Sequence, residues 1–195
     1  MIRTYFNQRA AIWDKTVAEN DRTKLERMAS RLNIKPGSSV LDIGSGTGIF
    51  IPYLLDHIGQ TGKLIALDIA EEMLKVAKAK GFMGDIEYLC ADVTNLPVWD
   101  ETFTVVVCYS SFPHFQDKLK ALREMNRVLE NSGRLFICHT LSRTQVNEIH
   151  RSIPAVRDDT IPDEDEMKTL LQAAGFTNIS IEDQDDSYLV SARKP

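Results

Sequence analysis

The sequence predicts an α/β protein with a mostly parallel β-sheet that is covered by helices on both faces. Short apolar segments alternate with segments of helical periodicity from residue 39 onward, a pattern typical of consecutive βαβ units. One segment, Val105-Val106-Val107, is apolar at successive positions, as in a strand buried on both faces. A glycine-rich turn at residues 44–48 links the first strand candidate to the next helix.

The N-terminal region, residues 4–33, is expected to be helical in two pieces. The first piece runs from Thr4 to Trp13 and is rich in aromatic residues. The second piece has one apolar face, because apolar residues recur at i, i+3, i+4 and i+7; they are Leu25, Met28, Ala29 and Leu32. Pro36-Gly37 ends this region.

The alternating region follows in a regular order. We expect strands near residues 39–44, 63–68, 86–90, 103–109 and 133–139, and helices near 48–58, 71–81 and 117–130. Residues 94–102 contain Pro97 and are expected to form an irregular connection.

The C-terminal part is expected to hold two helices and two strands. The first helix carries His150, and the second lies near residues 163–174 and ends before Gly175. Apolar and polar residues then alternate around Ile179 and Ile181, and less clearly from Tyr188, which indicates two strands joined by a turn at 185–186.

Composition limits the domain organisation and the partners. The 195 residues suit one domain, expected as an N-terminal helical segment (1–34) that covers the active site of a core (35–195). A net charge of −5 disfavours a nucleic-acid substrate. No apolar run approaches the roughly 20 residues of a membrane span, and the first residues lack a signal-peptide core. We therefore expect a cytoplasmic protein with no membrane partner.

The three cysteines are expected to be small core residues rather than a metal site or a disulfide framework. They lie near predicted strands, their number is odd, and no two have C-x-x-C spacing; they are Cys90, Cys108 and Cys138.

The glycine turn is the most informative motif. Residues 40–48 read Val-Leu-Asp-Ile-Gly-Ser-Gly-Thr-Gly. Glycines permit positive φ and let a ligand lie against the main chain, while the following helix offers free N–H groups. The spacing G-x-G-x-G differs from the dinucleotide fingerprint G-x-G-x-x-G. Asp42 would repel a pyrophosphate but suits an ammonium group, and S-adenosylmethionine (SAM) carries one.

This segment resembles motif I of the class I SAM-dependent methyltransferases, and the resemblance extends over roughly residues 35–140. Leu64 to Asp68 resembles the family's second strand and residues 86–93 its third. The resemblance implies a Rossmann-like, doubly wound sheet of seven strands, mostly parallel with an antiparallel last strand. It also implies SAM as the cofactor, and the nearest group is the small-molecule, quinone-biosynthesis C-methyltransferases.

The resemblance assigns donor-site roles to particular residues. Asp42 is expected to bind the ammonium group of SAM, Asp68 the two ribose hydroxyls and Asp92 the adenine amine. Ile69 and Met73 are expected to sandwich the adenine. The full expected set is Asp42, Gly44, Ser45, Gly46, Gly48, Asp68, Ile69, Met73, Asp92, Val93 and Tyr109. The alternatives are local: Asp68 as a helix cap and Asp92 as the opening of a turn.

The acceptor side is expected at the loop after the fourth strand. Residues 109–115 read Tyr-Ser-Ser-Phe-Pro-His-Phe and lie at the carboxyl end of the sheet, where ligands bind in open α/β folds. His114 is the candidate general base, or else a structural loop residue. His139, at the end of the fifth strand, is a second catalytic candidate. The acceptor pocket is expected to come from the N-terminal helices, residues 109–116 and residues 139–162.

Three further patterns have two readings. Three histidines at one rim suggest a metal site, but their spacing matches no ligand signature, and no metal is expected. The acidic run 158–166 is expected to be solvated surface and a helix start. Residues 6–14 resemble the N-terminal segment of the quinone-biosynthesis enzymes, which closes over SAM; the alternative is plain packing on the sheet.

The function expected is methyl transfer from SAM to a small molecule. A protein or RNA methyltransferase is a second reading, but Tyr109-Ser110-Ser111-Phe112 stands where such enzymes carry Asn/Asp-Pro-Pro followed by an aromatic residue. A SAM-binding regulatory or scaffold protein without catalysis is a third. The oligomeric state stays open.

Overall fold

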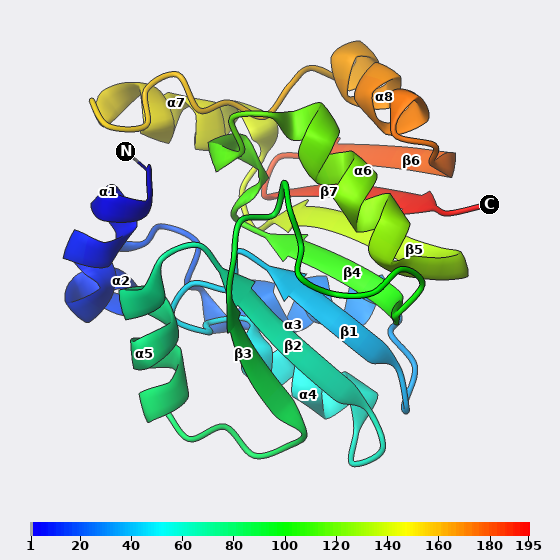
Figure 1. The fold of residues 1–195 in the computed structure, drawn as a ribbon. Coiled ribbons are helices and arrows are strands. Elements are labelled where there is room, and N and C mark those ends of the chain that lie inside the picture. Colours follow the sequence, from blue (N-terminus) through cyan, green and yellow to red (C-terminus); the bar gives the residue numbers. More distant parts are fainter. Residues whose placement is uncertain (1) are drawn as a thin grey trace.

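The computed structural model describes residues 2–195 and shows a seven-stranded sheet with helices on both faces (Figure 1). The strand order is β3-β2-β1-β4-β5-β7-β6. The sheet is parallel from β3 to β5, and β7 is antiparallel to both of its neighbours. The predicted fold class is confirmed.

The strands follow the predicted segments closely. They are β1 (Ser39–Ile43), β2 (Lys63–Asp68), β3 (Ile86–Cys90), β4 (Phe103–Tyr109), β5 (Leu129–His139), β6 (Thr177–Gln184) and β7 (Ser187–Arg193). The register pairs Ile43 with Leu67 and Asp68 with Cys90. The carboxyl ends of β1, β2 and β3 therefore meet at one edge of the sheet.

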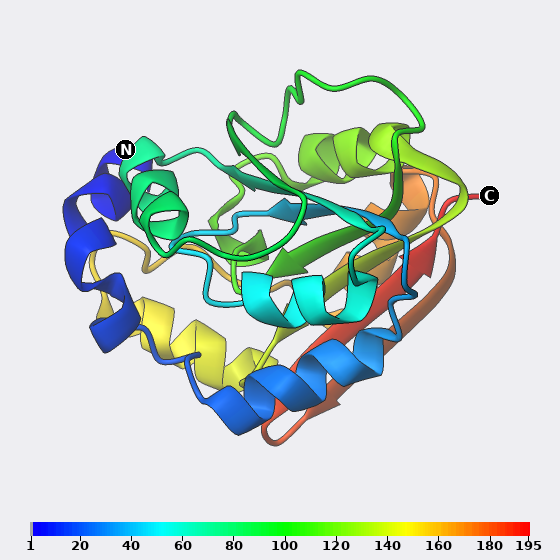
Figure 2. The same cartoon turned by 90° about the horizontal axis from the view of Figure 1, so that it is seen from below.

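Two hydrophobic clusters sandwich the sheet. One packs α3 (Arg22–Leu32) and α4 (Ile51–Ile58) against strand residues such as Val105 and Val107. The other packs α6 (Lys118–Val128) and α8 (Glu164–Ala173) against Val106 and Cys108. Seen from below, α3 and α4 lie on one side of the sheet and α6 on the other (Figure 2). Successive residues of β4 thus enter opposite clusters, which explains its uninterrupted apolar run.

The N-terminal region differs from the prediction between its two helical pieces. It consists of α1 (Ile2–Arg9), η1 (Ala10–Ile12), α2 (Trp13–Thr16) and α3. Residues 17–21 are not helical. Val17 is extended, with φ −71° and ψ 133°, and Asp21 caps α3 by accepting from the Lys24 N–H (3.0 Å). This break lets Glu19 turn inward.

Smaller differences have local causes. Helix α4 begins at Ile51 rather than 48, because the glycine turn occupies the intervening residues. Strand β5 begins at Leu129, before the predicted 133, because Leu129 pairs with Phe103. Cys108 and Cys138 are buried as expected, but Cys90 is exposed at the end of the edge strand β3.

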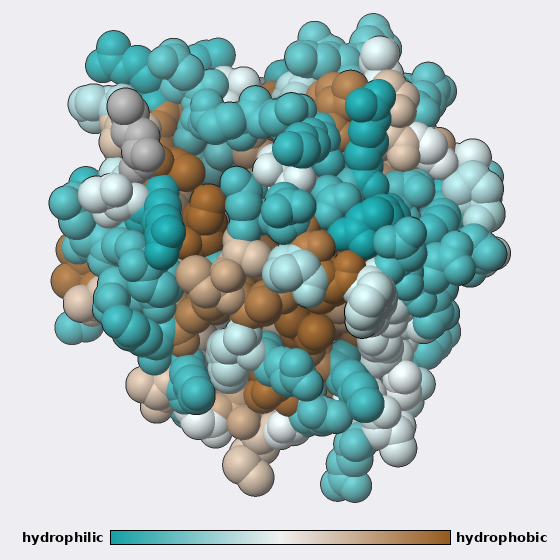
Figure 3. Space-filling model, in the orientation of Figure 1, coloured by the Kyte–Doolittle hydropathy of each residue, from teal (hydrophilic) through white to brown (hydrophobic). Residues whose placement is uncertain are grey.

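The remaining helices are α5 (Glu71–Ala79), which contacts α1, and α7 (Arg143–Ser152), which carries His150. Arg3 Nε of α1 donates to Glu71 Oε2 (2.8 Å). Hydrophilic residues dominate the outline of the face in Figure 3, whereas hydrophobic residues gather toward its middle. Within residues 2–195, no helix has the length and apolar character needed to cross a membrane.

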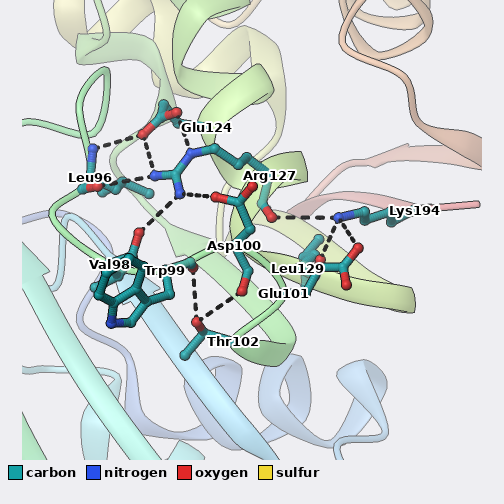
Figure 4. A network of polar contacts seen from close by, with 10 residues as sticks. All are labelled: Leu96, Val98, Trp99, Asp100, Glu101, Thr102, Glu124, Arg127, Leu129 and Lys194. Carbon is teal, nitrogen blue, oxygen red and sulfur yellow. Dashed lines mark hydrogen bonds and ion pairs between the residues drawn. The ribbon is translucent and has the colours of Figure 1, made fainter.

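The irregular connection between β3 and β4 is confirmed, and Arg127 of α6 holds it (Figure 4). Its guanidinium donates to the carbonyls of Leu96 (3.0 Å) and Val98 (2.9 Å), and forms an ion pair with Asp100 (2.7 Å). It also donates twice to the Glu124 carboxylate, at 2.7 Å each. One half-buried side chain thus replaces the backbone hydrogen bonds that a helix would have supplied here.

Arg127→Met should lower the free energy of unfolding by about 1–3 kcal/mol, because two carbonyls and the carboxylates of Asp100 and Glu124 lose this donor. Urea titration of the parent protein and the variant measures this free energy. Arg123→Met, an exposed position on the same helix, is the matched control and should change it by less than about 0.5 kcal/mol. Equal effects of the two substitutions would contradict the role given to Arg127.

Candidate functional site

A first cavity of about 290 Å³ lies at the carboxyl ends of β1, β2 and β4. It is closed by the N-terminal helices and by the loop that contains η2 (Phe112–His114). Most of the residues expected to bind a donor or substrate line it: Gly44, Ser45, Gly46, Asp68, Ile69, Met73, Asp92, Val93, Tyr109 and His114. Asp42, Gly48 and His139 do not line it.

The glycine turn has the backbone shape that its sequence predicts. Gly44, Gly46 and Gly48 have φ values of 71°, 56° and 80°. The N–H groups of Gly44 and Ser45 both donate to the Leu67 carbonyl, at 2.7 and 2.9 Å. A Cβ on Gly44 would lie 2.3 Å from the Ser111 Cβ. Only glycine therefore allows the turn to pass between β2 and the loop after β4.

Asp42 lies beneath the turn with an unsatisfied carboxylate. The residue is buried, and within residues 2–195 neither carboxylate oxygen has a hydrogen-bond partner. Burial, and secondarily the charge of Asp68, raises its pKa to about 7. A buried carboxylate without donors is costly, and an ammonium group or a bridging water would satisfy it. The orphaned carboxylate thus fits the ammonium end of SAM.

Asp68 ends β2 and ties the turn to the following helix. Its Oδ2 accepts from the Gly46 N–H and its Oδ1 from the Ala70 N–H, at 2.8 Å each. Burial raises its pKa to about 6, although both backbone hydrogen bonds oppose the shift. The carboxylate lines the first cavity and retains acceptor capacity. Asp68 is not the N-cap of α5, which is Ala70, but its carboxylate holds the backbone on both sides of the cavity wall that it lines.

The candidate adenine residues lie along one wall. Asp92 is exposed, and its Oδ1 accepts from the Thr94 N–H (2.8 Å), as the turn reading predicts. Val93 is buried beside it, and Ile69 and Met73 line the cavity. Met73 also packs in a small cluster with Ala10 of η1, so this wall contacts the N-terminal segment.

Gly48 and His139 lie outside the cavity for different reasons. A Cβ on Gly48 would lie 2.8 Å from the Phe82 ring, so this glycine permits packing behind the turn. His139 is only 1% exposed, and its Nδ1–H donates to Glu19 Oε1 (2.8 Å). Its Nε2 has no partner among the described residues. The expected direct catalytic contact of His139 with a substrate is therefore absent from this arrangement.

Glu19 is a site residue that the sequence did not reveal. It is buried and lines the first cavity. Besides His139, its carboxylate accepts from Ser110 Oγ (2.7 Å) and from the Thr140 N–H (2.6 Å). Burial opposes ionisation, but His139 and these donors together lower its pKa below the usual range. Its surroundings in the sequence are polar and carry no periodic signal, so only the fold shows its importance.

His114 lines the first cavity and pairs with Asp159. The His114 Nδ1–H donates to Asp159 Oδ2 (2.8 Å). Burial opposes ionisation of Asp159, but hydrogen bonds from His114 and Gln116 lower its pKa. The expectation that the acidic run 158–166 is solvated is thus wrong at Asp159, whose side chain is 12% exposed.

A second cavity of about 310 Å³ adjoins the first. Both cavities are lined by Phe6, Trp13, Val17, Glu19, Ser110 and His114. Farther in, the second is walled by aliphatic residues of α7 and the chain that follows it: Val146, Ile149, Ile153 and Val156. Its walls come from the three segments that the sequence predicts for the acceptor pocket. Across residues 2–195, no group of three or more potential ligands is arranged to hold a metal ion.

Comparison with known proteins agrees with this geometry. Residues 41–137 match the family model described as a methyltransferase domain. The ubiquinone/menaquinone biosynthesis C-methyltransferase UbiE of Escherichia coli O1:K1 is 30% identical in an alignment 174 residues long, and the match covers 75% of this chain and 69% of that protein.

Solved structures share the architecture. A SAM-dependent methyltransferase from Aquifex aeolicus has a TM-score of 0.73 and 26% identity, covering 90% of this chain and 95% of its own. A chain from the complex of the Haloferax volcanii Trm112 methyltransferase activator with a methyltransferase has a TM-score of 0.82 and 21% identity. That match covers 100% of this chain and 98% of the other, and at this identity it shows the fold alone.

Asp42→Asn should stabilise the ligand-free protein at pH 8 and lose this advantage toward pH 4. Asp42 has a pKa of about 7 when folded and about 3.8 when unfolded. The folded protein therefore holds a proton that the unfolded chain releases, so stability falls as the pH rises from about 4 to 7. The cost is about 1.4 kcal/mol for each unit by which the pKa is raised.

Urea unfolding of both proteins at the two pH values measures this difference. Asp56→Asn, at an exposed position on α4, is the control and should stay within about 0.5 kcal/mol of the parent. A gain from Asp42→Asn that is the same at pH 4 and pH 8 would contradict the account of Asp42.

Proposed function

This chain belongs to the class I SAM-dependent methyltransferases, and from that premise we propose that it methylates a small-molecule acceptor. The observation that carries the proposal is the pair of cavities that adjoin at His114. One is lined by Gly44, Gly46 and the carboxylates of Asp68 and Asp92, and the other is largely apolar. Such an arrangement suits a donor and an acceptor that approach each other from two sides.

The first cavity is proposed as the donor site. Asp42 lies beneath the turn and does not line the cavity, so it would meet the ammonium group through a bridging water. Asp68 would meet the ribose hydroxyls. Asp92 and the Val93 N–H would meet the adenine edge, with Ile69 and Met73 on its faces and Tyr109 nearby. When bound, SAM supplies a methyl group that is already activated on a sulfonium. The protein's task is then to position the acceptor, exclude water and accept a proton where one is released.

The second cavity is proposed as the acceptor site. Its aliphatic walls favour a molecule with an apolar body. His114 stands where the two cavities adjoin and would accept the proton of the acceptor. Phe6 packs edge-on against His114, with ring centroids 5.0 Å apart, and against Trp13 at 5.3 Å. These aromatic rings would keep water from the reacting atoms.

The N-terminal segment is proposed as the cover of both cavities within a single domain. Residues 17–21 cross the ends of β4 and β5, where Glu19 binds Ser110, Thr140 and His139. On the other side, the Asn7 side chain accepts from the Glu72 N–H (3.0 Å). Asp14 of the same segment also contacts Thr47 and pairs with Lys80 (2.6 Å). These contacts hold the cover over the sheet edge, and its movement would admit the ligands.

Transfer of label from methyl-labelled SAM to a panel of phenols, thiols, amines and carboxylic acids tests the proposed activity. Label in a small-molecule product supports it. Label in protein or RNA alone, or binding of SAM without any transfer, would favour the two competing readings instead.

Ile149→Trp should fill the second cavity, lowering kcat/KM for the acceptor about tenfold or more while leaving the affinity for S-adenosylhomocysteine unchanged. Ile149 lines only the second cavity. Glu148→Trp places the same side chain at the neighbouring exposed position of α7 and is the control. Equal turnover by the two variants would exclude this cavity as the acceptor site.

S-adenosylhomocysteine should slow tryptic cleavage after Lys15, because a ligand that contacts Phe6 and Trp13 stabilises the closed cover. Lys15 is exposed between the contacts of Asp14 and Glu19, whereas Lys63 is exposed at the opposite end of the sheet and reports general stabilisation. A cleavage rate at Lys15 that is the same with and without the ligand would refute the cover.

A further inference from the structure

The His114–Asp159 pair is mostly buried, and hydrogen bonds hold the loop that carries His114. Both side chains are 12% exposed, and Nδ1 and Oδ2 are 2.8 Å apart. The loop that carries His114 is fixed by Lys118, whose Nζ donates to the carbonyls of Pro113 and Phe115, at 3.1 Å each. The imidazole ring therefore has a defined position at the junction of the cavities.

Asp159 is itself held on two sides. Gln116 Nε2 donates to its Oδ1 (3.3 Å), and His150 Nδ1–H donates to its backbone carbonyl (2.6 Å). Burial lowers the pKa of His150, which favours a neutral ring that competes little for the Asp159 charge. The His150 ring also lies against the His114 ring, with centroids 4.8 Å apart.

The hydrogen bond to Asp159 decides which ring nitrogen of His114 can accept a proton. A carboxylate only accepts hydrogen bonds, so the proton of neutral His114 resides on Nδ1. Nε2 then carries a lone pair, and no described residue donates a hydrogen bond to it. Asp159 lines neither cavity, so it acts through His114 and not on a ligand.

We propose that Asp159 is a positioning residue that makes His114 Nε2 a proton acceptor, so that the acceptor substrate is one that loses a proton on methylation. The inference rests on the proposed function. Acceptors with a dissociable O–H, N–H or activated C–H bond belong to this class. Thioethers and tertiary amines, which have no such proton, do not.

The step balances as a displacement coupled to proton transfer. The X–H bond of the acceptor breaks and its proton moves to Nε2. The electron pair left on X forms the new bond to the methyl carbon, and the old carbon–sulfur bond breaks with its pair on sulfur. His114 becomes an imidazolium, whose charge the adjacent Asp159 carboxylate stabilises. The proton returns to solvent before the next turnover.

Heteronuclear NMR of isotope-labelled histidine tests the first half of the proposal. In the wild-type complex with S-adenosylhomocysteine, neutral His114 should show a protonated Nδ1 and an unprotonated Nε2. A protonated Nε2 in that complex would overturn the proposal, because no lone pair would then face the junction.

Kinetics with 1-naphthol and thiophenol as probe acceptors test the second half. Asp159→Asn keeps the side-chain shape and removes its charge. It should lower kcat for the phenol by about 10- to 1,000-fold, with KM for SAM unchanged. Thiophenol is largely ionised at neutral pH and needs no base, so its turnover should change less than twofold.

Asp158→Asn, at the adjacent exposed position, is the matched control and should leave both rates within twofold. Thermal unfolding of the variants checks that they are folded.

If Asp159→Asn leaves the transfer to the phenol unchanged, or slows both acceptors equally, the proposal is overturned. If the wild type binds S-adenosylhomocysteine but methylates neither probe nor any member of the acceptor panel, it is the proposed function that fails, and the NMR result still decides the state of His114.

Discussion

The close passage of the glycine turn between β2 and the loop after β4 is the constraint on which the site depends. Gly44 has no room for a Cβ beside Ser111 and has a φ of 71°. The turn is then fixed by Gly46, whose N–H donates to Asp68. This geometry leaves the Asp42 carboxylate buried without a hydrogen-bond partner among residues 2–195. Burial of this unpaired carboxylate lowers the stability of the ligand-free fold, and a cationic ligand group would reduce that cost.

The second element of the site is the way the N-terminal segment is anchored. The Glu19 carboxylate accepts hydrogen bonds from Ser110, which follows β4, and from Thr140, which follows β5. Tyr109 Oη donates to the Glu19 carbonyl (2.9 Å). The carboxylate and the backbone of one residue therefore fasten the segment over the sheet edge. Because the same segment supplies Phe6 and Trp13 to both cavities, movement of the proposed cover would also change the shape of the proposed acceptor site.

Sequence reasoning predicted what depends on local pattern. The strands, the glycine turn and the placement of Asp68 and His114 at the ligand-facing edge follow from periodicity and motif spacing. It missed Glu19 and Asp159, because each lies in a polar stretch and becomes important only through a partner 120 or 45 residues away in the chain. It also placed His139 at the site, since a strand end fixes the position of a residue but not the direction of its side chain.

The most direct test of the account is calorimetric titration of the wild-type protein with S-adenosylhomocysteine and, separately, with NAD. The spacing of the glycines and the buried Asp42 predict saturable binding of S-adenosylhomocysteine with a stoichiometry of about one per chain and no heat from NAD. Binding of NAD instead, or of neither ligand by the folded protein, would contradict the assignment of the first cavity as a SAM site.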